Sequence, residues 1–448
     1  MKVSQLTTEE ITHLCREYTL FEWSMQAAIK PIVVDHAQGV YFWDTDGKRY
    51  IDFNSQLMNV NIGHGNKKVI QAIKDQADKL AYTSPFHATE VRGRLGQLLA
   101  EVTPGNLKKS FFTLGGAEAN ENAVKIARFY TGKHKIMARY RSYHGGTAGA
   151  ITLTGDPRRW PAEPGIPGVV RFLDPHCYRC PFGQQVATCH LECAKHLEEV
   201  IMYEGPHTIA AVILETVTGT NGIIIPPKDY LQQVRAICHK YGILLITDEI
   251  MSGFGRTGEW FAVDHWNVVP DIMSVAKGLT SGYVPLGATV ISEPIGQFFE
   301  DHVFWGGLTY NSHALGCAAA IATINVYKEE GLIENARKMG KLLGQELEKL
   351  KAKHPSVGDV RYIGLFAIVE LVKNRQSKEP MAPFNAKASE MGAMGKLAAF
   401  LRENGFYTFV RWNMIHVNPP LCINGAELLE GLDILDKGLE ITDQAVQA

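Results

Sequence analysis

The stretch that decides the fold is residues 243–278, ILLITDEIMSGFGRTGEWFAVDHWNVVPDIMSVAKG. Its first four residues are branched and apolar, and they stop at a polar group that contains Asp248, which is typical of a buried parallel strand. A second strand-like run, residues 271–276, ends at Lys277. Because α/β sheets bind their ligands at the carboxyl ends of parallel strands, the stretch predicts that an acid and an amine share one sheet edge.

Lys277 and Asp248 together suit one kind of cofactor. A lysine amine can form a Schiff base with an aldehyde, and a neighbouring carboxylate can keep a pyridinium nitrogen protonated. Pyridoxal 5′-phosphate (PLP) requires both, with Lys277 as its attachment point and Asp248 as the partner of its ring nitrogen. Taken alone, each residue is better explained as an ordinary charged group at a strand end, so the assignment depends on further motifs.

Four short segments around these residues match a known signature. They are residues 246–250 (ITDEI), 253–258 (GFGRTG), 270–271 (PD) and 276–278 (AKG). Together they resemble the class III aminotransferases, the fold type I PLP enzymes of the ω-amino acid:pyruvate group, and the resemblance covers nearly the whole chain. It implies an α/β fold, with a mostly parallel seven-stranded sheet flanked by helices in a large domain. A smaller α+β domain would be built from both termini.

Residues 253–258 also fit the G-x-G-x-x-G pattern of dinucleotide-binding loops. Such a loop directly follows a strand and opens a helix. Here residues 248–252 separate the glycines from the strand, and no helix cap follows them. The pattern therefore argues against a dinucleotide site.

The composition indicates a large globular protein. The chain has 448 residues, of which 46% are hydrophobic, and a formal net charge of −2. Without a basic tract it is not expected to bind nucleic acid or anionic membranes. No apolar run is long enough to cross a bilayer, and residues 1–6 lack the features of a signal peptide. We therefore expect a cytoplasmic protein with two or three domains.

Local patterns place the domain limits. A capping box at Thr7 predicts an N-terminal helix, and Asp46–Gly47 predicts a hairpin. Alternating helix and strand patterns then fill residues 66–330, the expected large PLP-binding domain. Lys and Glu become frequent beyond this region. Residues 331–448 are therefore expected to form the C-terminal small domain, with residues 1–65 as the N-terminal part of that domain.

Two further patterns concern the large domain. A strand at residues 210–214, a helix at residues 230–237 and the Asp248 strand form an expected β-α-β unit. Residues 313–328 are expected to form a long amphipathic helix.

A glycine pair marks the expected phosphate site. Gly115 and Gly116 lie between a strand-like run, residues 110–113, and a helix pattern that begins near Glu118. Free backbone N–H groups and the helix dipole favour an anion at such a helix start. The family usually has Ser-Gly-Ser or a similar triplet here, whereas this chain has Gly115 and Ala117 in place of the hydroxyl residues. The phosphate contacts therefore fall to the backbone of Gly116 and Ala117.

The resemblance implies four further cofactor contacts. Tyr143, in a Tyr-His-Gly segment, would stack on the cofactor ring, and Ile250 would pack on the opposite face. Glu215, at a strand end, would orient polar groups beside the cofactor. Thr309, in a Gly-Leu-Thr-Tyr motif, would reach the phosphate of the other subunit, so the expected assembly is a homodimer with shared active sites, or a tetramer. For Tyr143 and Glu215 alone, simple packing and an ordinary strand-end acid remain open alternatives.

Three residues are candidates for substrate binding. Arg411, followed by a Pro-Pro-Leu segment, resembles the family arginine that grips a substrate carboxylate, and a guanidinium donates two parallel bonds to such a group. Trp23 and Met58 resemble residues that line the substrate pocket. A surface arginine and plain core packing remain open alternatives for these three positions.

Four of the eight cysteines cluster in residues 171–196: Cys177, Cys180, Cys189 and Cys193. A C-x-x-C pair beside a second pair could bind zinc or an iron–sulfur cluster. The second pair is C-x-x-x-C, and the loop between the pairs is short. A cytoplasmic setting argues against stable disulfides. Reduced, packed thiols are the preferred interpretation, a structural metal is the alternative, and no catalytic metal is expected.

The resemblance implies a PLP-dependent aminotransferase that works by a ping-pong mechanism, with Lys277 as the proton carrier. The amino donor would be taurine, β-alanine, 4-aminobutyrate, another ω-amino acid or a simple amine. The acceptor would be a 2-oxo acid, with pyruvate expected. The alternatives are a PLP-dependent aminomutase or phospholyase of the same fold, and a non-catalytic PLP-fold binding protein.

Overall fold

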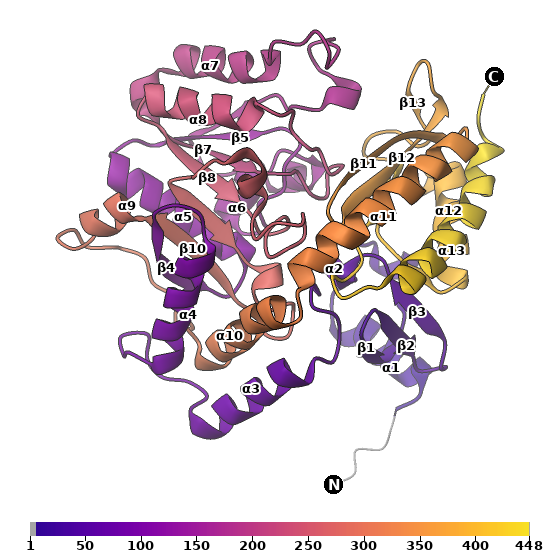
Figure 1. The fold of residues 1–448 in the computed structure, drawn as a ribbon, viewed down its shortest axis with the longest axis horizontal. Helices are drawn as coiled ribbons and strands as arrows, with labels where there is room; N and C mark the ends of the chain where they lie inside the picture. The colour runs from indigo at the N-terminus through magenta and orange to yellow at the C-terminus, as the bar shows by residue number, and fades with distance from the viewer. Residues whose placement is uncertain (1–5, 448) are drawn as a thin grey trace.

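A computed structural model describes residues 6–447. The sequence argument against a signal peptide used residues 1–6, and residues 1–5 lie outside the described part of the chain. Within residues 6–447, every helix is too short or too polar to cross a bilayer. A large sheet with its helices lies beside a smaller region that contains both the first strands, β1 to β3, and the last helices, α11 to α13 (Figure 1).

Seven strands form the central sheet, in the order β4-β10-β9-β8-β7-β5-β6. β10 is antiparallel to both of its neighbours, and every other adjacent pair is parallel. The mostly parallel seven-stranded sheet expected from the sequence is therefore confirmed. Its strands are β4 (Leu107–Thr113), β5 (Lys135–Arg139), β6 (Val169–Phe172), β7 (Ile209–Glu215), β8 (Leu244–Asp248), β9 (Ile272–Val275) and β10 (Gly287–Ser292).

The three central strands end at the same sheet edge. All seven residues of β7 are buried, as expected for a strand that is covered on both faces. The register pairs Glu215 with Asp248, and Asp248 with Ser274 near the end of β9. Lys277 follows the end of β9 after one intervening residue, Ala276. Parallel pairing therefore brings two carboxylates and one amine from separate segments to one edge.

Helices cover the central sheet and extend beyond it (Figure 1). α5 packs across β4, β8, β9 and β10, and α8 packs against β8. The helices of this region are α3 (Lys67–Lys79), α4 (Glu90–Val102), α5 (Gly116–Thr131), α6 (Ala148–Leu153), α7 (Glu192–Glu204), α8 (Tyr230–Lys240), α9 (Glu293–Phe298) and α10 (Ala314–Glu329).

The helix expected at residues 313–328 is present as α10, but its expected amphipathic character is wrong. Residues 316–320 are all buried, so this part of the helix has no solvent-facing stripe. The reason is packing: α3, α4 and α11 (Leu332–Lys353) all lie against α10.

Two smaller sheets lie outside the central one, and the first of them joins N-terminal and C-terminal segments of the chain. In the first, β1 (Val34–Gln38), β2 (Tyr41–Asp44) and β3 (Arg49–Asp52) are antiparallel neighbours, and β14 (Phe406–Tyr407) pairs in parallel with β3. The second has the order β11-β12-β16-β15, with β13 beside β12. Its strands are β11 (Val357–Ile363), β12 (Phe366–Asn374), β13 (Glu379–Pro380), β15 (Val410–Arg411) and β16 (Met414–Val417).

The local signals near the N-terminus are confirmed. Thr7 caps α1 (Thr8–Tyr18) in a reciprocal capping box with Glu10. Asp46–Gly47 joins β2 to β3, and Gly47 has the positive φ, +80°, that the turn requires. The remaining helices are α2 (Ser55–Met58), α12 (Gly392–Glu403) and α13 (Gly425–Asp443).

The glycine-rich loop at residues 253–258 is a structural loop. It forms turns and opens no helix. Arg256 within it is fully buried, and its guanidinium donates hydrogen bonds to the carbonyl oxygens of Leu365 and Pro419. Its Nη2 atom donates to two side chains of the N-terminal region, those of Ser55 and Asn61. The loop therefore connects three parts of the chain, in agreement with the rejection of a dinucleotide site.

Candidate active site

A cavity of about 370 Å³ lies at the carboxyl ends of the central strands. Its wall includes seven of the residues that the sequence predicted for the cofactor: Gly116, Ala117, Tyr143, Glu215, Asp248, Ile250 and Lys277. These residues are distant in sequence, and the parallel sheet with α5 brings them together.

Asp248 is a fixed, buried carboxylate in the cavity wall. Its Oδ2 accepts a hydrogen bond from Nδ2 of Asn120 at 2.8 Å and lies 2.8 Å from Nδ1 of His144. Its Oδ1 accepts the backbone N–H of Ile250 at 3.1 Å. Hydrogen bonds to a charged group are strong, and together they hold the carboxylate in one orientation. An oriented buried anion suits a cationic ring nitrogen.

Lys277 begins the short turn η6 (Lys277–Leu279) and has a positive φ of +42°. Residues other than glycine seldom adopt this backbone conformation, and those that do cluster at functional sites. Burial lowers the pKa of Lys277, although attraction by Asp248 and Glu215 opposes that shift. More of the amine is therefore neutral near pH 7 than in an exposed lysine. The neutral amine is the form that attacks an aldehyde or accepts a proton.

Glu215, in the cavity wall, is hydrogen-bonded to the segment that contains Tyr143. One carboxylate oxygen accepts the backbone N–H of Tyr143 at 3.0 Å, and the other accepts that of Gly219 at 2.8 Å. Burial raises the pKa of Glu215, and the neighbouring charge of Asp248 raises it further. The side chain therefore fixes the loop that carries Tyr143.

The start of α5 provides backbone donors without a competing side chain. Gly115 is the N-cap residue of this 16-residue helix, and no side chain caps it. A Cβ built on Gly116 would lie 2.6 Å from the Cδ1 of Ile250, so Gly116 permits close packing at this point. Ala117 lines the same end of the cavity. An anion can bind here through main-chain N–H groups.

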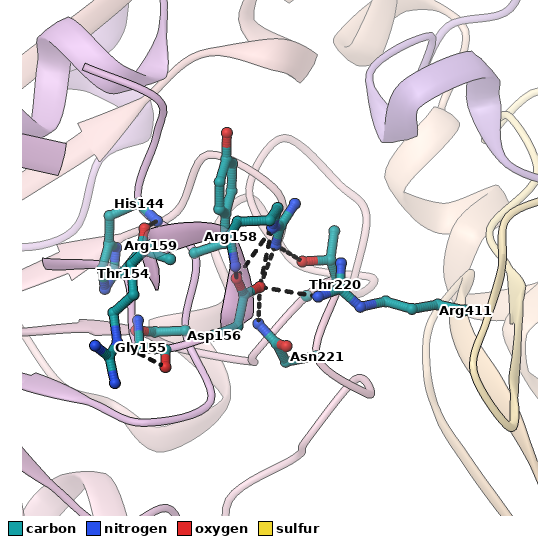
Figure 2. A network of polar contacts seen from close by, with 12 residues as sticks. His144, Thr154, Gly155, Asp156, Arg158, Arg159, Thr220, Asn221 and Arg411 are labelled. Carbon is teal, nitrogen blue, oxygen red and sulfur yellow. Dashed lines mark hydrogen bonds and ion pairs between the residues drawn. The ribbon is translucent and has the colours of Figure 1, made fainter. Parts of the chain in front are cut away.

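A second charged group lies beside Tyr143, and we call it the arginine subsite (Asp156, Arg158 and Arg411). The guanidinium carbon of Arg158 lies 3.6 Å from the ring centre of Tyr143 and 5.6 Å from that of Trp23. Nη2 of Arg411 donates to Oδ2 of Asp156 at 3.1 Å. Figure 2 shows the two arginines reaching the same carboxylate from different segments.

The other predicted residues lie outside the cavity wall. Trp23 is 57% exposed and packs edge-on against Tyr143, with 6.1 Å between ring centres. Met58 is buried in the hydrophobic core and does not line the cavity. Thr309 is exposed, its carbonyl oxygen accepts a hydrogen bond from the hydroxyl of Tyr82 at 2.9 Å, and it does not line the cavity of its own chain.

The sequence interpretation missed four polar residues. His144 follows Tyr143 directly and could have been found from that adjacency. Asn120 lies one turn into the helix that starts at the predicted phosphate site, so its position on α5 was a usable signal. Asp156 and Arg158 carried no recognisable pattern, because only the fold brings them to Arg411.

The residues present fit PLP. A buried amine, an oriented carboxylate and an uncapped helix start share one cavity. They match an aldehyde, a pyridinium nitrogen and a phosphate. With the seven-stranded sheet, this chemistry defines a fold type I PLP enzyme.

Comparison with known proteins then gives the family. The family model for class III aminotransferases matches residues 24–439. Taurine–pyruvate aminotransferase of Bilophila wadsworthia is 36% identical over 450 residues, which cover 97% of this chain and 98% of that protein. Leucine/methionine racemase of Thermococcus litoralis is 36% identical over 429 residues, 94% of this chain and 93% of that protein. A solved structure of taurine:2-oxoglutarate aminotransferase from Bifidobacterium kashiwanohense, in complex with PLP and glutamate, has a TM-score of 0.95 and 43% identity, and the match covers 98% and 99% of the two chains.

The chain belongs to the class III aminotransferases. It is therefore a PLP-dependent aminotransferase whose substrates are an amine and a 2-oxo acid.

The cysteine cluster is separate from this site. Cys177, Cys180, Cys189 and Cys193 line a different cavity of about 210 Å³, next to the N-terminus of α7. All four are free thiols. In the described part of the chain, no group of three or more His, Cys, Asp or Glu side chains is arranged to hold a metal ion. The cluster takes no part in the catalytic site.

Proposed function

We propose that this enzyme transfers the amino group of an ω-amino acid or amine to a 2-oxo acid. The donor class comprises taurine, β-alanine, 4-aminobutyrate and simple amines, and pyruvate is the expected acceptor. The observation that carries the proposal is the arginine subsite next to the Lys277 cavity, because two guanidiniums can bind the acid group of a substrate. The names of the taurine aminotransferases reported above support this class of donor.

When bound, PLP supplies the aldehyde that captures the amino group and the electron sink that stabilises the carbanion. Lys277 provides the proton carrier, since its buried amine has a lowered pKa and can accept a proton from the substrate carbon. Asp248 holds a negative charge at the cavity wall, and Asn120 and His144 keep that charge in place. Gly116 and Ala117 provide backbone donors for a phosphate.

Arg411 and Arg158 are proposed to orient the substrate by its carboxylate or sulfonate. Both lie largely out of solvent, so a charge-assisted hydrogen bond to either one is stronger than it would be at the surface. Trp23 is proposed to close the outer side of this subsite through its contact with Tyr143. Met58 is proposed to support the substrate pocket indirectly, as part of the hydrophobic core, since it does not line the cavity itself.

The proposed assembly is a cytoplasmic homodimer, or a tetramer made of such dimers. Thr309 is exposed in a segment that also exposes Trp305 and Tyr310, and we propose that it completes the phosphate site of the partner subunit. Gel filtration with light scattering measures the assembly. A Thr309→Ala variant that kept full affinity for PLP in the assembled protein would contradict the shared site.

The activity is tested by pairing each donor with pyruvate and with 2-oxoglutarate and measuring alanine or glutamate. Purified protein should carry the visible absorption of bound PLP, and a Lys277→Ala variant should lose both that absorption and turnover. Lys328→Ala, at the exposed end of α10, serves as the control. Turnover that persisted in Lys277→Ala would remove Lys277 from the mechanism.

One relative favours a second candidate, amino acid racemisation, because the Thermococcus litoralis protein of similar identity is named as a racemase. The aminomutase and phospholyase alternatives use the same cavity. Incubation with L-leucine and no 2-oxo acid separates racemisation from transamination. D-Leucine without any oxo acid product would support the racemase.

A further inference from the structure

The carboxylate of Asp156 is the common partner of both arginines in the arginine subsite. Asp156 precedes the turn η2 (Pro157–Ala162) and is 1% exposed. The Nε of Arg158 donates to both carboxylate oxygens, at 3.1 and 3.0 Å, and its Nη2 donates to Oδ2 at 2.5 Å. Nη2 of Arg411 donates to the same Oδ2 at 3.1 Å, and Nδ2 of Asn221 does so at 3.0 Å. Figure 2 shows these donors around one carboxylate.

Asp156 stays charged in this position. Burial alone would raise the pKa of its carboxyl, but the hydrogen bonds and charge of Arg158, with the charge of Arg411, hold that pKa below its usual range. Two guanidiniums and one carboxylate are therefore in direct contact, and the subsite carries one net positive charge.

The arginines keep capacity for a further anion. Nε of Arg411 is buried and has no hydrogen-bond partner within residues 6–447. Arg158 is held between Tyr143 and Asp156, and its Nη2 also donates to the hydroxyl of Thr220 at 2.7 Å. An incoming acid group shares these donors with Asp156, because a guanidinium can bond more than one acceptor.

We infer that Asp156 sets the charge selectivity of the substrate site: it limits the subsite to one net positive charge and so favours substrates with one anionic group over dianionic ones. The inference rests on the proposed function, in that the acid group of a substrate binds at Arg158 and Arg411. Asp156 acts through the arginines, so it is a positioning residue.

The consequence is a change in a ratio of affinities. In an Asp156→Asn variant the net positive charge of the arginine subsite rises from one to two. The first acid group of a ligand then loses some binding free energy, because the arginines are held less firmly. A second acid group gains more binding free energy than this from the extra positive charge. A merely structural role would weaken monoanions and dianions equally and would leave their ratio unchanged. The ratio therefore separates the charge effect from loosening of the fold.

The test uses the PLP-loaded enzyme and two unreactive probes, propionate and glutarate, with binding measured by calorimetry. In Asp156→Asn, the glutarate Kd divided by the propionate Kd should fall at least threefold relative to the wild type. Asp156→Glu keeps the charge and should restore the wild-type ratio. Asp271→Asn is the matched control, since Asp271 also binds an arginine side chain through two hydrogen bonds but precedes β9 and lines a different cavity.

A second variant protects the test against misfolding of Asp156→Asn. Asn221→Asp adds a carboxylate beside the arginines and should move the ratio at least threefold in the opposite direction. The inference is overturned if the ratio of the glutarate and propionate Kd values is unchanged in folded Asp156→Asn and folded Asn221→Asp. It is also overturned if Asp156→Glu shifts this ratio as much as Asp156→Asn does.

Turnover is measured in parallel, as kcat/KM for 2-oxoglutarate relative to pyruvate, and the preference for the dianion should rise in Asp156→Asn. If the Kd ratio shifts as expected while no donor–acceptor pair reacts, the proposed function fails and the charge role of Asp156 stands. If transamination is present and the Kd ratio does not move, the charge role fails alone.

Discussion

The support of Asp248 by His144 and Asn120 gives the sharpest prediction. Both side chains contact the same oxygen, Oδ2, at 2.8 Å, and both are buried. Loss of a hydrogen bond to a charged group costs about 1.5–3 kcal/mol, which corresponds to a decrease of roughly 10- to 150-fold in rate if it appears in the transition state. His144→Ala and Asn120→Ala should each reduce kcat/KM within this range.

The two changes should also be non-additive, because each variant releases the same oxygen from one of its two donors. The assay is the initial rate of alanine or glutamate formation at saturating PLP, with the PLP dissociation constant measured separately. Asn122→Ala is the matched control: Asn122 is buried on the same helix, but its Nδ2 donates to the carbonyl oxygen of Glu118 and not to Asp248. A decrease of less than threefold in folded His144→Ala and Asn120→Ala would refute the reasoning.

Three further predictions follow from the geometry. Gly116→Ala should weaken PLP binding at least tenfold, because its Cβ would lie 2.6 Å from the Cδ1 of Ile250, whereas the Cβ of Gly115→Ala meets nothing within 4 Å and this variant should bind PLP normally. Equal PLP affinities of the two variants would count against a phosphate site at the start of α5. Arg411→Gln should raise KM for the 2-oxo acid by roughly 10-fold or more, because one charged hydrogen bond is lost, and should leave KM for an amine without an acid group unchanged. Burial, with the nearby charge of Arg411, lowers the pKa of His416 to about 3, so His416 stays neutral in the folded protein. The unfolded chain takes up a proton at this histidine below about pH 6.5, so the free energy of unfolding falls as the pH falls from about 6.5 towards 3. Between pH 7 and 5 the wild type should lose about 2 kcal/mol more of this free energy than His416→Asn in denaturant titrations, and equal losses in the two proteins would contradict the lowered pKa.

The meeting of Asp248 and Lys277 in one cavity could be predicted because the signal at each strand end is local. An apolar run that stops at Asp248, and another that stops at Lys277, define both the strand and the edge where its last side chain lies. The signal for the proposed phosphate site at Gly116 is local in the same way, since a glycine before a helix pattern marks free N–H groups. Parallel pairing then places these separate segments together without further information.

The arginine subsite could not be predicted from local patterns. Asp156 and Arg411 are brought together by packing between the large sheet region and the strand pair β15–β16, and nothing in either segment encodes the other. The error on α10 has a similar origin, because spacing shows which residues are apolar but not how many neighbours surround a helix. α3, α4 and α11 bury faces that the sequence pattern would leave to solvent.

The parallel pairing of β14 with β3 has a consequence for synthesis on the ribosome. The backbone N–H of Ile51 donates to the carbonyl group of Gly405, and that of Phe53 donates to the carbonyl group of Tyr407. An emerging nascent chain therefore has an unpaired strand edge at β3 until almost the whole polypeptide has left the exit tunnel. Arg411 follows in the same C-terminal region, so the proposed pocket for the substrate acid is completed only when the first and last parts of the chain have met.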